Sequence, residues 1–312
     1  SVCKYSSDPV NVCNGNFIYE DTFLRIDCIS EVKFGVFYNS QDSRKGLLGK
    51  GLRHNYELEI VEENDLIKVI MADGSEKIFS VVEESQYIPL EYTLASLQKA
   101  ENHLIFVDEE KITYVFNIDG KVESITDLTG NQLRVLYDED NRIIKAENQF
   151  GDFIKYTYES DKLCKVSDYA GREIRLEYSN DLLNKISDIN GQRARFEYKK
   201  ETLTEIYNAR NILGIKNIYD NTNRVVQQKF PDGGVVTFEY DETENKTTVV
   251  DQNEIKIVYY HDDYCRCTRI VYPEGEEIFK YNNKNLKEAF IDKKGNETKY
   301  KYDNQGNLIE VI

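Results

Sequence analysis

Residues 158–177 read YESDKLCKVSDYAGREIRLE, and residues 178–197 read YSNDLLNKISDINGQRARFE. Both stretches begin with Tyr, pass through a polar turn and a short apolar run, and reach a second turn that contains Gly. Each then alternates apolar and charged residues up to the next Tyr. Self-similarity at a fixed period of this length is the sequence signature of a repeat architecture.

The same unit recurs along most of the chain. Successive head tyrosines are separated by 21, 20, 20, 21, 21, 20, 21 and 21 residues, and Phe116 takes the head position in an earlier unit. The repeat array is therefore predicted to run over residues 116–312, and its last unit is incomplete. We expect the heads to pack between repeats; they are Tyr137, Tyr158, Tyr178, Tyr198, Tyr219, Tyr240, Tyr260, Tyr281 and Tyr302.

The pattern within one unit predicts a β-hairpin. Ile174 and Leu176 precede Tyr178 at alternate positions, with charged residues between them, which places the three side chains on one face of a strand. Two strands of about six residues and two turns of about four make up the period. Glycines recur at the second turn, where we expect a positive φ angle; they are Gly130, Gly151, Gly171, Gly191 and Gly295.

The predicted fold is all-β, with antiparallel hairpin repeats in one continuous sheet. The chain has 23 Tyr and 14 Phe but no Trp and one Met, a composition that favours strands. About twenty adjacent strands cannot form a flat open sheet, because strand twist accumulates. We therefore expect a curled, spiralling sheet with the tyrosine face on the inside, which would form part of a shell.

The repeats and the N-terminal sequence resemble a known family. Tyr-Asp heads at 137, 219, 240 and 302 are similar to the YD repeats of Rhs (rearrangement hot spot) proteins, insecticidal toxin-complex shell proteins and teneurins. The stretches DPVNVCNGNFIYEDTFLRI (8–26) and FYNSQDSRKGLLGKGLRHNYE (37–57) resemble the module that precedes Rhs repeats, although Leu52 stands where the family usually has Trp. The matching motif residues are Asp8, Pro9, Gly15, Asn16, Tyr38, Asn39, Gly49, Gly51, His54, Asn55 and Tyr56.

The resemblance implies a domain organisation and a role. Residues 1–60 would form the N-terminal module, acting as a cap or plug, residues 61–115 irregular hairpins, and residues 116–312 the repeat array. Family shells enclose a toxic polypeptide or, in teneurins, form a recognition surface. Complete shells are several times longer than this chain, and the family's self-cleavage signature has no counterpart here, because the only Asp-Pro is Asp8-Pro9. We therefore expect a non-enzymatic shell segment of an Rhs-type bacterial toxin system.

The composition of the chain and its incomplete last repeat indicate which kinds of binding partner to expect. A net charge of −16 argues against nucleic acid and anionic membranes, and no apolar stretch is long enough for membrane insertion. The unit begun at Tyr302 ends in an apolar strand at 307–312 without a hairpin partner. Such an edge recruits another strand, so we expect a polypeptide to dock there, either toxin cargo or a further shell segment.

Two classes of function stay open at this point. The first is the secreted or cell-surface shell segment, although no signal peptide is visible in this chain. The second is an extracellular recognition module that binds glycan or a protein partner through the sheet, with tyrosines such as Tyr156 and Tyr300 stacking on sugar rings. Bound polypeptide would favour the first class, and glycan binding lost on replacing these tyrosines would favour the second.

Residues with catalytic or metal-binding chemistry are dispersed. The three histidines (His54, His103 and His261) lack metal-ligand spacing, and His54 is expected to be a hydrogen-bonding residue of the module. Cys265 and Cys267 are expected to be ordinary strand residues, and Cys3, Cys13 and Cys28 to include one disulfide if the protein is exported. Acidic turns offer carboxylates for Ca²⁺, but turn capping explains them equally. We expect no enzyme activity, no cofactor and no metal.

Overall fold

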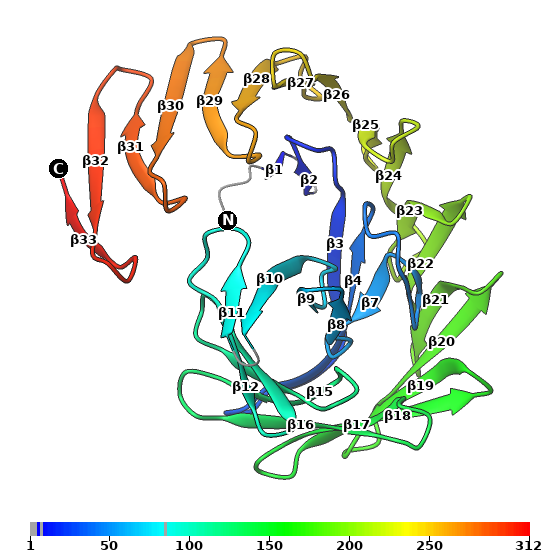
Figure 1. Ribbon diagram of the computed structural model, residues 1–312. Coiled ribbons are helices and arrows are strands. Elements are labelled where there is room, and N and C mark those ends of the chain that lie inside the picture. The colour runs from blue at the N-terminus through cyan, green and yellow to red at the C-terminus, as the bar shows by residue number, and fades with distance from the viewer. Residues whose placement is uncertain (1–4, 7–8, 84–85) are drawn as a thin grey trace. The chain divides into compact units, whose positions relative to one another are not determined.

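The fold consists of strands and turns. The computed structural model describes residues 5–6, 9–83 and 86–312, and no helix occurs in these ranges (Figure 1). The predicted all-β fold is therefore confirmed. Within the described ranges there is accordingly no helical segment suited to crossing a lipid bilayer.

The N-terminal strands form small antiparallel sheets. The strand orders are β1-β2, β3-β4-β7, β5-β6 and β11-β10-β9-β8. Their bounds are β1 (Tyr5–Ser6), β2 (Val10–Asn11), β3 (Ile18–Ile26), β4 (Val32–Asn39), β5 (Lys45–Gly46), β6 (Gly49–Lys50), β7 (Leu52–His54), β8 (Glu59–Glu63), β9 (Leu66–Ile70), β10 (Glu76–Glu83) and β11 (Gln86–Pro89).

One long sheet takes up the rest of the chain. Twenty-two strands lie in sequence order from β12 to β33, and the two ends of this order are not paired with each other. The bounds are β12 (Ser96–Ala100), β13 (His103–Val107), β14 (Thr113–Phe116), β15 (Val122–Thr126), β16 (Gln132–Tyr137), β17 (Ile143–Asn148), β18 (Phe153–Glu159), β19 (Lys162–Asp168), β20 (Glu173–Ser179), β21 (Leu182–Asp188), β22 (Gly191–Lys199), β23 (Thr202–Tyr207), β24 (Leu213–Tyr219), β25 (Val225–Lys229), β26 (Val235–Asp241), β27 (Lys246–Val250), β28 (Lys256–His261), β29 (Cys267–Tyr272), β30 (Gly275–Tyr281), β31 (Lys287–Ile291), β32 (Glu297–Tyr302) and β33 (Leu308–Val311).

The chain divides into two compact units. Unit 1 comprises Ser1–Ile18, Tyr198–Ile206 and Ile212–Ile312, and unit 2 comprises Tyr19–Glu197 and Tyr207–Asn211. The long sheet begins at Ser96, upstream of the first recognised repeat. The boundaries at 60/61 and 115/116 that the sequence suggests stay a prediction.

Unit 2 packs the N-terminal strands against the start of the long sheet. The ring of Phe79 on β10 lies 6.2 Å from that of Phe106 on β13, and both side chains are fully buried. The Ile60 N–H donates to the Gly120 carbonyl at 2.8 Å. Gly120 has φ +71°, and a Cβ there would lie 2.3 Å from the Ile60 carbonyl oxygen, so only glycine fits at this contact.

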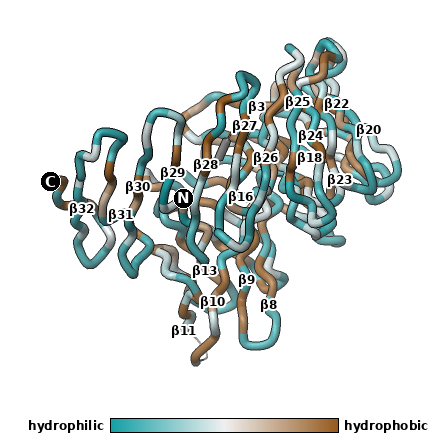
Figure 2. The backbone as a smooth tube through the Cα atoms, turned by 90° about the horizontal axis from the view of Figure 1, so that it is seen from above, coloured by the Kyte–Doolittle hydropathy of each residue, from teal (hydrophilic) through white to brown (hydrophobic). Residues whose placement is uncertain are grey.

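Unit 1 has its own apolar cluster on the late repeats. Cys267, Ile270 and Phe279 are nearly fully buried, and partly buried aromatic and aliphatic side chains surround them: Ile257, Tyr259, Tyr272, Tyr281 and Phe290. Figure 2 shows the general pattern, with hydrophobic residues along the strands and hydrophilic residues at the turns. Strand alternation of this kind buries one face of each hairpin.

Many of the turns are built around the carboxylate oxygen of an Asp or the amide oxygen of an Asn. Asp138 Oδ1 accepts the N–H groups of Asp140 and Arg142 at 3.0 and 2.9 Å, and Asn148 accepts those of Phe150 and Asp152 in the same way. Such an Asx turn holds the chain reversal without help from another strand. The same pattern recurs at Asn117, Asp127, Asp168, Asp220, Asp251, Asp262, Asn282, Asp292 and Asp303.

The turn glycines have the expected backbone conformation. Their φ angles lie between +81° and +116°, and no heavy atom lies within 4 Å of a Cβ built on any of Gly130, Gly151, Gly171, Gly191 and Gly295. Backbone conformation, not space, therefore favours glycine at these turns.

Asp220 provides a test of the turn motif. Its carboxylate accepts the N–H groups of Thr222 and Arg224 at 2.9 and 3.0 Å and the Arg224 Nε–H at 2.8 Å. Asp220→Ala should lower the free energy of unfolding by about 1–2 kcal/mol in urea titrations. Asp220→Asn should cost less than half as much, because the amide oxygen still accepts both backbone N–H groups, as Asn148 does.

Ionisation of Asp220 also makes the stability of the wild-type protein depend on pH. Burial would raise the pKa of Asp220, but hydrogen bonds from the Arg224 backbone and side chain outweigh burial and lower this pKa to about 2. A folded-state pKa below the unfolded value of about 3.9 stabilises the fold above pH ~4, and this stabilisation is lost as the pH falls towards 2. The gap in stability between wild type and Asp220→Asn should therefore close between pH 4 and pH 2. An unchanged gap would contradict this assignment.

Candidate functional site: the tyrosine ladder and the N-terminal module

The head tyrosines link neighbouring strands through their hydroxyl groups. The Tyr158 hydroxyl donates to the Ile143 carbonyl at 3.0 Å, and the Tyr178 hydroxyl donates to the Leu163 carbonyl at 2.9 Å. Five further heads reach back 14–16 residues in the same way: Tyr137 to Val122, Tyr219 to Leu203, Tyr240 to Val225, Tyr281 to Cys267, and Tyr302 to Lys287. Tyr198 lies on β22 and Tyr260 on β28.

A β-bulge in the next strand lies opposite most of the head tyrosines. The strand register shifts between Glu177 and Tyr178, and equivalent shifts precede Tyr137, Tyr158, Tyr219, Tyr281 and Tyr302. The extra residue of such a bulge lies on the strand that follows the head: Glu177 pairs with Lys185 and Tyr178 with Leu183, which leaves Asn184 on β21 unpaired. The strand that carries the head has no extra residue, so Ile174, Leu176 and Tyr178 alternate on one face as the sequence predicts. Leu176 is buried, whereas Tyr178 is only half-buried.

Cationic side chains cover the half-buried rings. The Arg142 guanidinium lies 5.1 Å from the Tyr158 ring centroid, and the Lys162 ammonium lies 5.3 Å from that of Tyr178. In unit 1, Arg224 lies 4.8 Å from the ring centroid of Tyr240. These cation–π contacts and the carbonyl bonds together account for the recurrence of Tyr at the head.

Two tyrosines of β18 provide a matched test of the ladder. Tyr158→Phe removes the bond to the Ile143 carbonyl, so we expect a loss of about 1 kcal/mol in the free energy of unfolding. Tyr156 is 2% exposed and its hydroxyl has no hydrogen-bond partner in the described structure. Tyr156→Phe should therefore be neutral or stabilising. Equal losses in the two variants, measured by urea unfolding, would refute the role of the head hydroxyl.

The motif residues of the N-terminal module fall into both units. Asp8 lies outside the described residues. Pro9, Gly15 and Asn16 belong to unit 1, and the others belong to unit 2: Tyr38, Asn39, Gly49, Gly51, His54, Asn55 and Tyr56. At Gly51, φ is +67° and a Cβ would lie 2.6 Å from the Asn39 carbonyl oxygen, so a side chain is excluded there.

Asn55 and Tyr56 hold strand β4 in place. The Asn55 side chain accepts the Gly35 N–H at 2.8 Å and donates to the Lys33 carbonyl at 3.0 Å. The Tyr56 hydroxyl accepts the Lys33 N–H at 3.2 Å. These side chains satisfy backbone groups of β4, which indicates a structural role for the end of the motif.

His54 is a core residue. It is 0% exposed, and its ring packs against those of Phe34 and Tyr156, at centroid distances of 6.1 and 5.3 Å. Its Nδ1 accepts the Tyr56 N–H at 3.2 Å. Burial, with a smaller contribution from Arg53, lowers the pKa of His54 to about 3, so the ring is neutral near pH 7.

Glu57 borders a cavity of about 410 Å³ in unit 2, between the module and the repeats. Its carboxylate accepts the Leu47 N–H at 2.7 Å and the His54 N–H at 3.3 Å. The heads Tyr137 and Tyr158 also line the cavity. Burial raises the pKa of Glu57 to about 7 against the opposing effect of Arg53.

The variant Glu57→Gln tests the raised pKa of Glu57 through the pH dependence of the free energy of unfolding. Because the folded-state pKa lies above the unfolded value, ionisation opposes folding, and wild-type stability should fall as the pH rises from about 4.5 to 7. Glutamine does not titrate, so the variant should gain about 1–2 kcal/mol relative to wild type between pH 4 and pH 8, after allowance for partial exposure. The comparison uses the slopes of stability against pH, because a pH-independent loss of stability caused by the glutamine amide does not affect these slopes. Parallel stability profiles would contradict a raised pKa.

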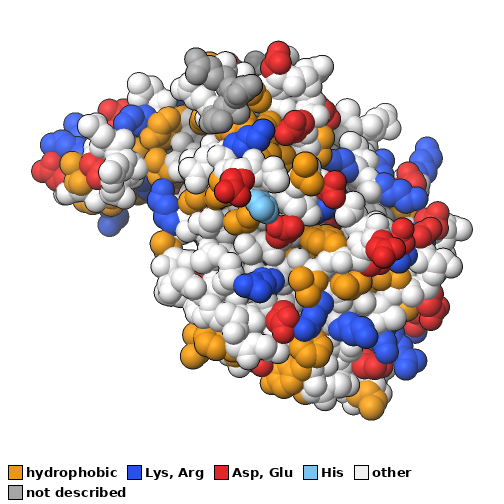
Figure 3. Space-filling view, turned by 60° about the horizontal axis from the view of Figure 1, so that its bottom comes forward, with side chains coloured by type: hydrophobic (Ala, Val, Ile, Leu, Met, Phe, Trp, Pro, Cys, Tyr) orange, Lys and Arg blue, Asp and Glu red, His pale blue; other side chains and the backbone are white. Residues whose placement is uncertain are grey.

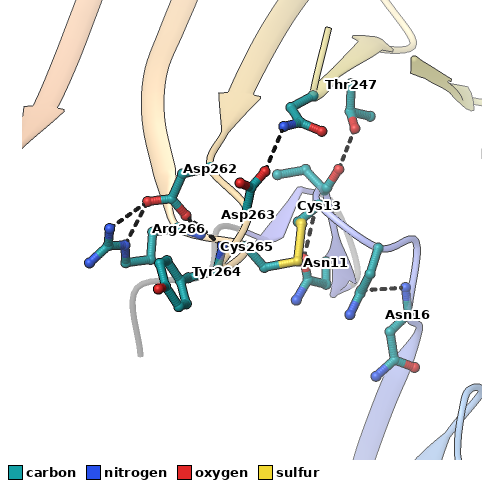
Figure 4. The surroundings of a disulfide bond; sticks show 12 residues. Asn11, Cys13, Asn16, Thr247, Asp262, Asp263, Tyr264, Cys265 and Arg266 are labelled. Atoms are coloured by element: carbon teal, nitrogen blue, oxygen red, sulfur yellow. Dashed lines mark hydrogen bonds and ion pairs between the residues drawn. A yellow bond between two sulfur atoms is a disulfide. The ribbon is translucent and has the colours of Figure 1, made fainter. Parts of the chain in front are cut away.

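In unit 1, an N-terminal loop (residues 9–18) closes on itself and reaches the late repeats. Its base is closed by the Ile18 N–H bond to the Pro9 carbonyl at 3.1 Å. At its tip, Cys13 forms a disulfide with Cys265, 252 residues away (Figure 4). The disulfide expected among Cys3, Cys13 and Cys28 thus joins Cys13 to a residue outside that set. Cys28 is free, and Cys3 lies outside the described residues.

The position of Cys265 differs from a second prediction. It was predicted to be an ordinary strand residue, but it lies in the turn before β29 with φ +57°. Asn141 and Asn223 hold the same place in the turns DEDNR and DNTNR, with φ +58° and +60°. Asn tolerates this left-handed conformation better than most residues. A Cys at an Asn position of the repeat was therefore a sequence signal for a special role.

The described residues contain no group of three or more His, Cys, Asp or Glu side chains arranged to hold a metal ion. The acidic turn residues accept backbone N–H groups instead, as Asp138 does. Tyr156, which glycan stacking would require at the surface, is 2% exposed, whereas Tyr300 is half-buried. On the face shown in Figure 3, positive and negative side chains are interspersed.

Comparison with family models gives two matches. Residues 7–79 match a domain of unknown function, DUF6531, and residues 98–210 match the Teneurin YD-shell. No curated protein matches the sequence.

Two of the solved structures that match this chain have low sequence identity to it. One is the Photorhabdus luminescens Tc holotoxin pore, with a TM-score of 0.47 and 13% identity over 79% of this chain and 15% of that chain. Another is TcdB2-TccC3, with a TM-score of 0.46 and 10% identity over 85% of this chain and 17% of that chain. The chain thus spans less than a fifth of the length of these proteins.

Proposed function

We propose that this chain, a member of the YD-repeat (Rhs) family, is a non-enzymatic shell segment of a secreted or cell-surface bacterial toxin system that partly encloses or presents a polypeptide cargo. The family predicted from the Tyr-Asp heads and the N-terminal motif is confirmed by the two family matches. The enclosed cargo, the toxin system and the location outside the cell are the proposed part.

The terminal strand of the sheet carries this proposal. β33 pairs with β32 along one edge, with Tyr300 opposite Val311 and Tyr302 opposite Leu308, and none of the strands in the described ranges pairs with its other edge. Leu308, Ile309 and Val311 are 52%, 63% and 57% exposed. An apolar strand with one open edge is a template for strand addition.

Backbone complementarity favours a polypeptide at this edge over a glycan. An added strand supplies alternating N–H and C=O groups along the whole of β33 and covers its apolar side chains at the same time. A sugar stacking on tyrosine rings would leave the backbone groups of the edge unpaired. We therefore propose that β33 is the docking edge for cargo or for a further shell segment.

The buried ionisable groups of unit 2 support a structural role. His54 and Glu57 both bond to backbone groups of the module itself. His54 is fully buried, which keeps it from any substrate. Burial and backbone bonding explain the low pKa of His54 and the raised pKa of Glu57 without invoking catalysis.

The docking edge can be tested on the full chain purified from its native source. Proteinase K treatment followed by mass spectrometry should detect protected peptides from a second polypeptide. Ile309→Lys places a charge on the edge strand, so it should abolish this association while circular dichroism and unfolding stay those of wild type.

A matched control separates edge pairing from general surface hydrophobicity. Leu128 is 72% exposed in a turn of unit 2, so Leu128→Lys changes surface charge equally but touches no sheet edge. This variant should keep the second polypeptide. A wild-type preparation without any second polypeptide, or equal loss in both variants, would overturn the proposal.

A further inference from the structure

The tip of the N-terminal loop contacts successive repeats of unit 1. The Val225 N–H at the start of β25 donates to the Gly15 carbonyl at 2.9 Å. The Thr247 hydroxyl on β27 donates to the Val12 carbonyl at 2.5 Å. Cys13 is bonded to Cys265 in the turn before β29, with a Cα–Cα distance of 5.6 Å (Figure 4). The loop therefore crosses the ends of alternate strands and ties them together.

Gly15 brings the loop close to the tyrosine ladder. Its φ is +69°, and a Cβ at this position would lie 2.5 Å from Arg224 Cβ and 2.8 Å from the Tyr240 hydroxyl oxygen. That hydroxyl also donates to the Val225 carbonyl. The loop tip and a head tyrosine thus meet at the same strand end, so displacing the tip alters a contact of the ladder.

The turn that carries Cys265 is held rigidly. Asp262 Oδ1 accepts the N–H groups of Tyr264 and Arg266, both at 3.0 Å, and Asp262 Oδ2 accepts the Arg266 Nε–H at 2.7 Å. The Asn245 amide donates to Asp263 at 3.2 Å. Cys265 is therefore presented to the loop in one conformation. Both bonded cysteines are half-buried and not fully enclosed.

We propose that the Cys13–Cys265 disulfide is a redox latch that holds the N-terminal loop on the late repeats, and that a dithiol reductant releases the loop tip. In the reaction, the two thiols of the reductant each give one electron and one proton to a latch sulfur. The Cys13–Cys265 bond breaks, Cys13 and Cys265 become thiols, and the reductant becomes a disulfide. The latch then depends on the compartment, because disulfides persist outside the cell and are reduced in the cytosol.

Hydrogen bonds join the tip to the repeats beside the disulfide. The two bonds to Val225 and Thr247 are ordinary hydrogen bonds, whereas the disulfide is the covalent link between the tip and β29. The side chains of Val10 and Phe17 at the base of the loop and of Val12 beside Cys13 are all buried. Reduction should therefore remove the covalent link of the tip to the turn before β29 and let the tip move, while the base stays packed. Resting on the proposed function, this release would loosen the shell around its cargo after entry into a reducing compartment.

Hydrogen exchange on the full chain tests the latch directly. Dithiothreitol treatment, Cys13→Ser and Cys265→Ser should each raise the exchange rate of the Val225 amide at least tenfold, because its acceptor at Gly15 moves away. The Leu183 amide, which donates to the Leu48 carbonyl within unit 2, should not change. Iodoacetamide labelling followed by mass spectrometry should modify Cys265 only after reduction.

Cys28→Ser is the matched control, because Cys28 is a free thiol in unit 2. This variant should keep the wild-type exchange rate at Val225 and the wild-type response to dithiothreitol. Unchanged protection of Val225 in reduced wild type and in both latch variants would overturn the proposal, as would labelling of Cys265 before reduction. This readout needs no cargo, so it separates failure of the latch from failure of the proposed function. Where a protected polypeptide is present, reduction should make it sensitive to protease in wild type and in Cys28→Ser.

Discussion

The hydrogen bond from each head tyrosine to a backbone carbonyl on a neighbouring strand is the contact on which the repeat depends. The bond spans 14–16 residues in each of the seven heads where it is defined, so its geometry is repeated from β15 to β32. Phenylalanine would supply the ring but not the bond, and a carbonyl that is removed from water needs a donor. The twenty-residue period follows, because each hairpin has to return a ring to the same distance from its predecessor.

Local turn chemistry supports this geometry without long-range contacts. An Asp or Asn oxygen that accepts two N–H groups closes many of the turns within five residues, as at Asp138 and Asn148. Each hairpin thus contains its own means of chain reversal, and neighbouring hairpins contribute the packing. Stability in such arrays is close to a sum of unit and interface contributions. The N-terminal strands add contacts of a different kind, because they connect parts of the chain that are far apart in sequence.

The sequence predicted the features that its period makes visible and missed those that depend on strand pairing or on distant residues. Strands, turns and the positive φ of Gly130 or Gly171 follow from a period that is visible in many copies. The bulge at Asn184, opposite Tyr178, was missed, because an extra residue on the partner strand leaves the apolar spacing before the head unchanged. The Cys13–Cys265 pair was missed because its members are 252 residues apart. Burial of Glu57 was also invisible in sequence, since a charged residue in the motif gives no sign of the backbone groups that surround it.

Unit 1 combines segments that are far apart in the sequence, and this affects the order in which the protein can fold during synthesis. The loop at residues 9–18 is synthesised before residues 19–197, and Val225, Thr247 and Cys265 are synthesised after them. Because domains fold as they are synthesised, unit 2 can mature while this loop still lacks its binding surface. The loop therefore has to stay unpaired on the ribosome until the late repeats emerge.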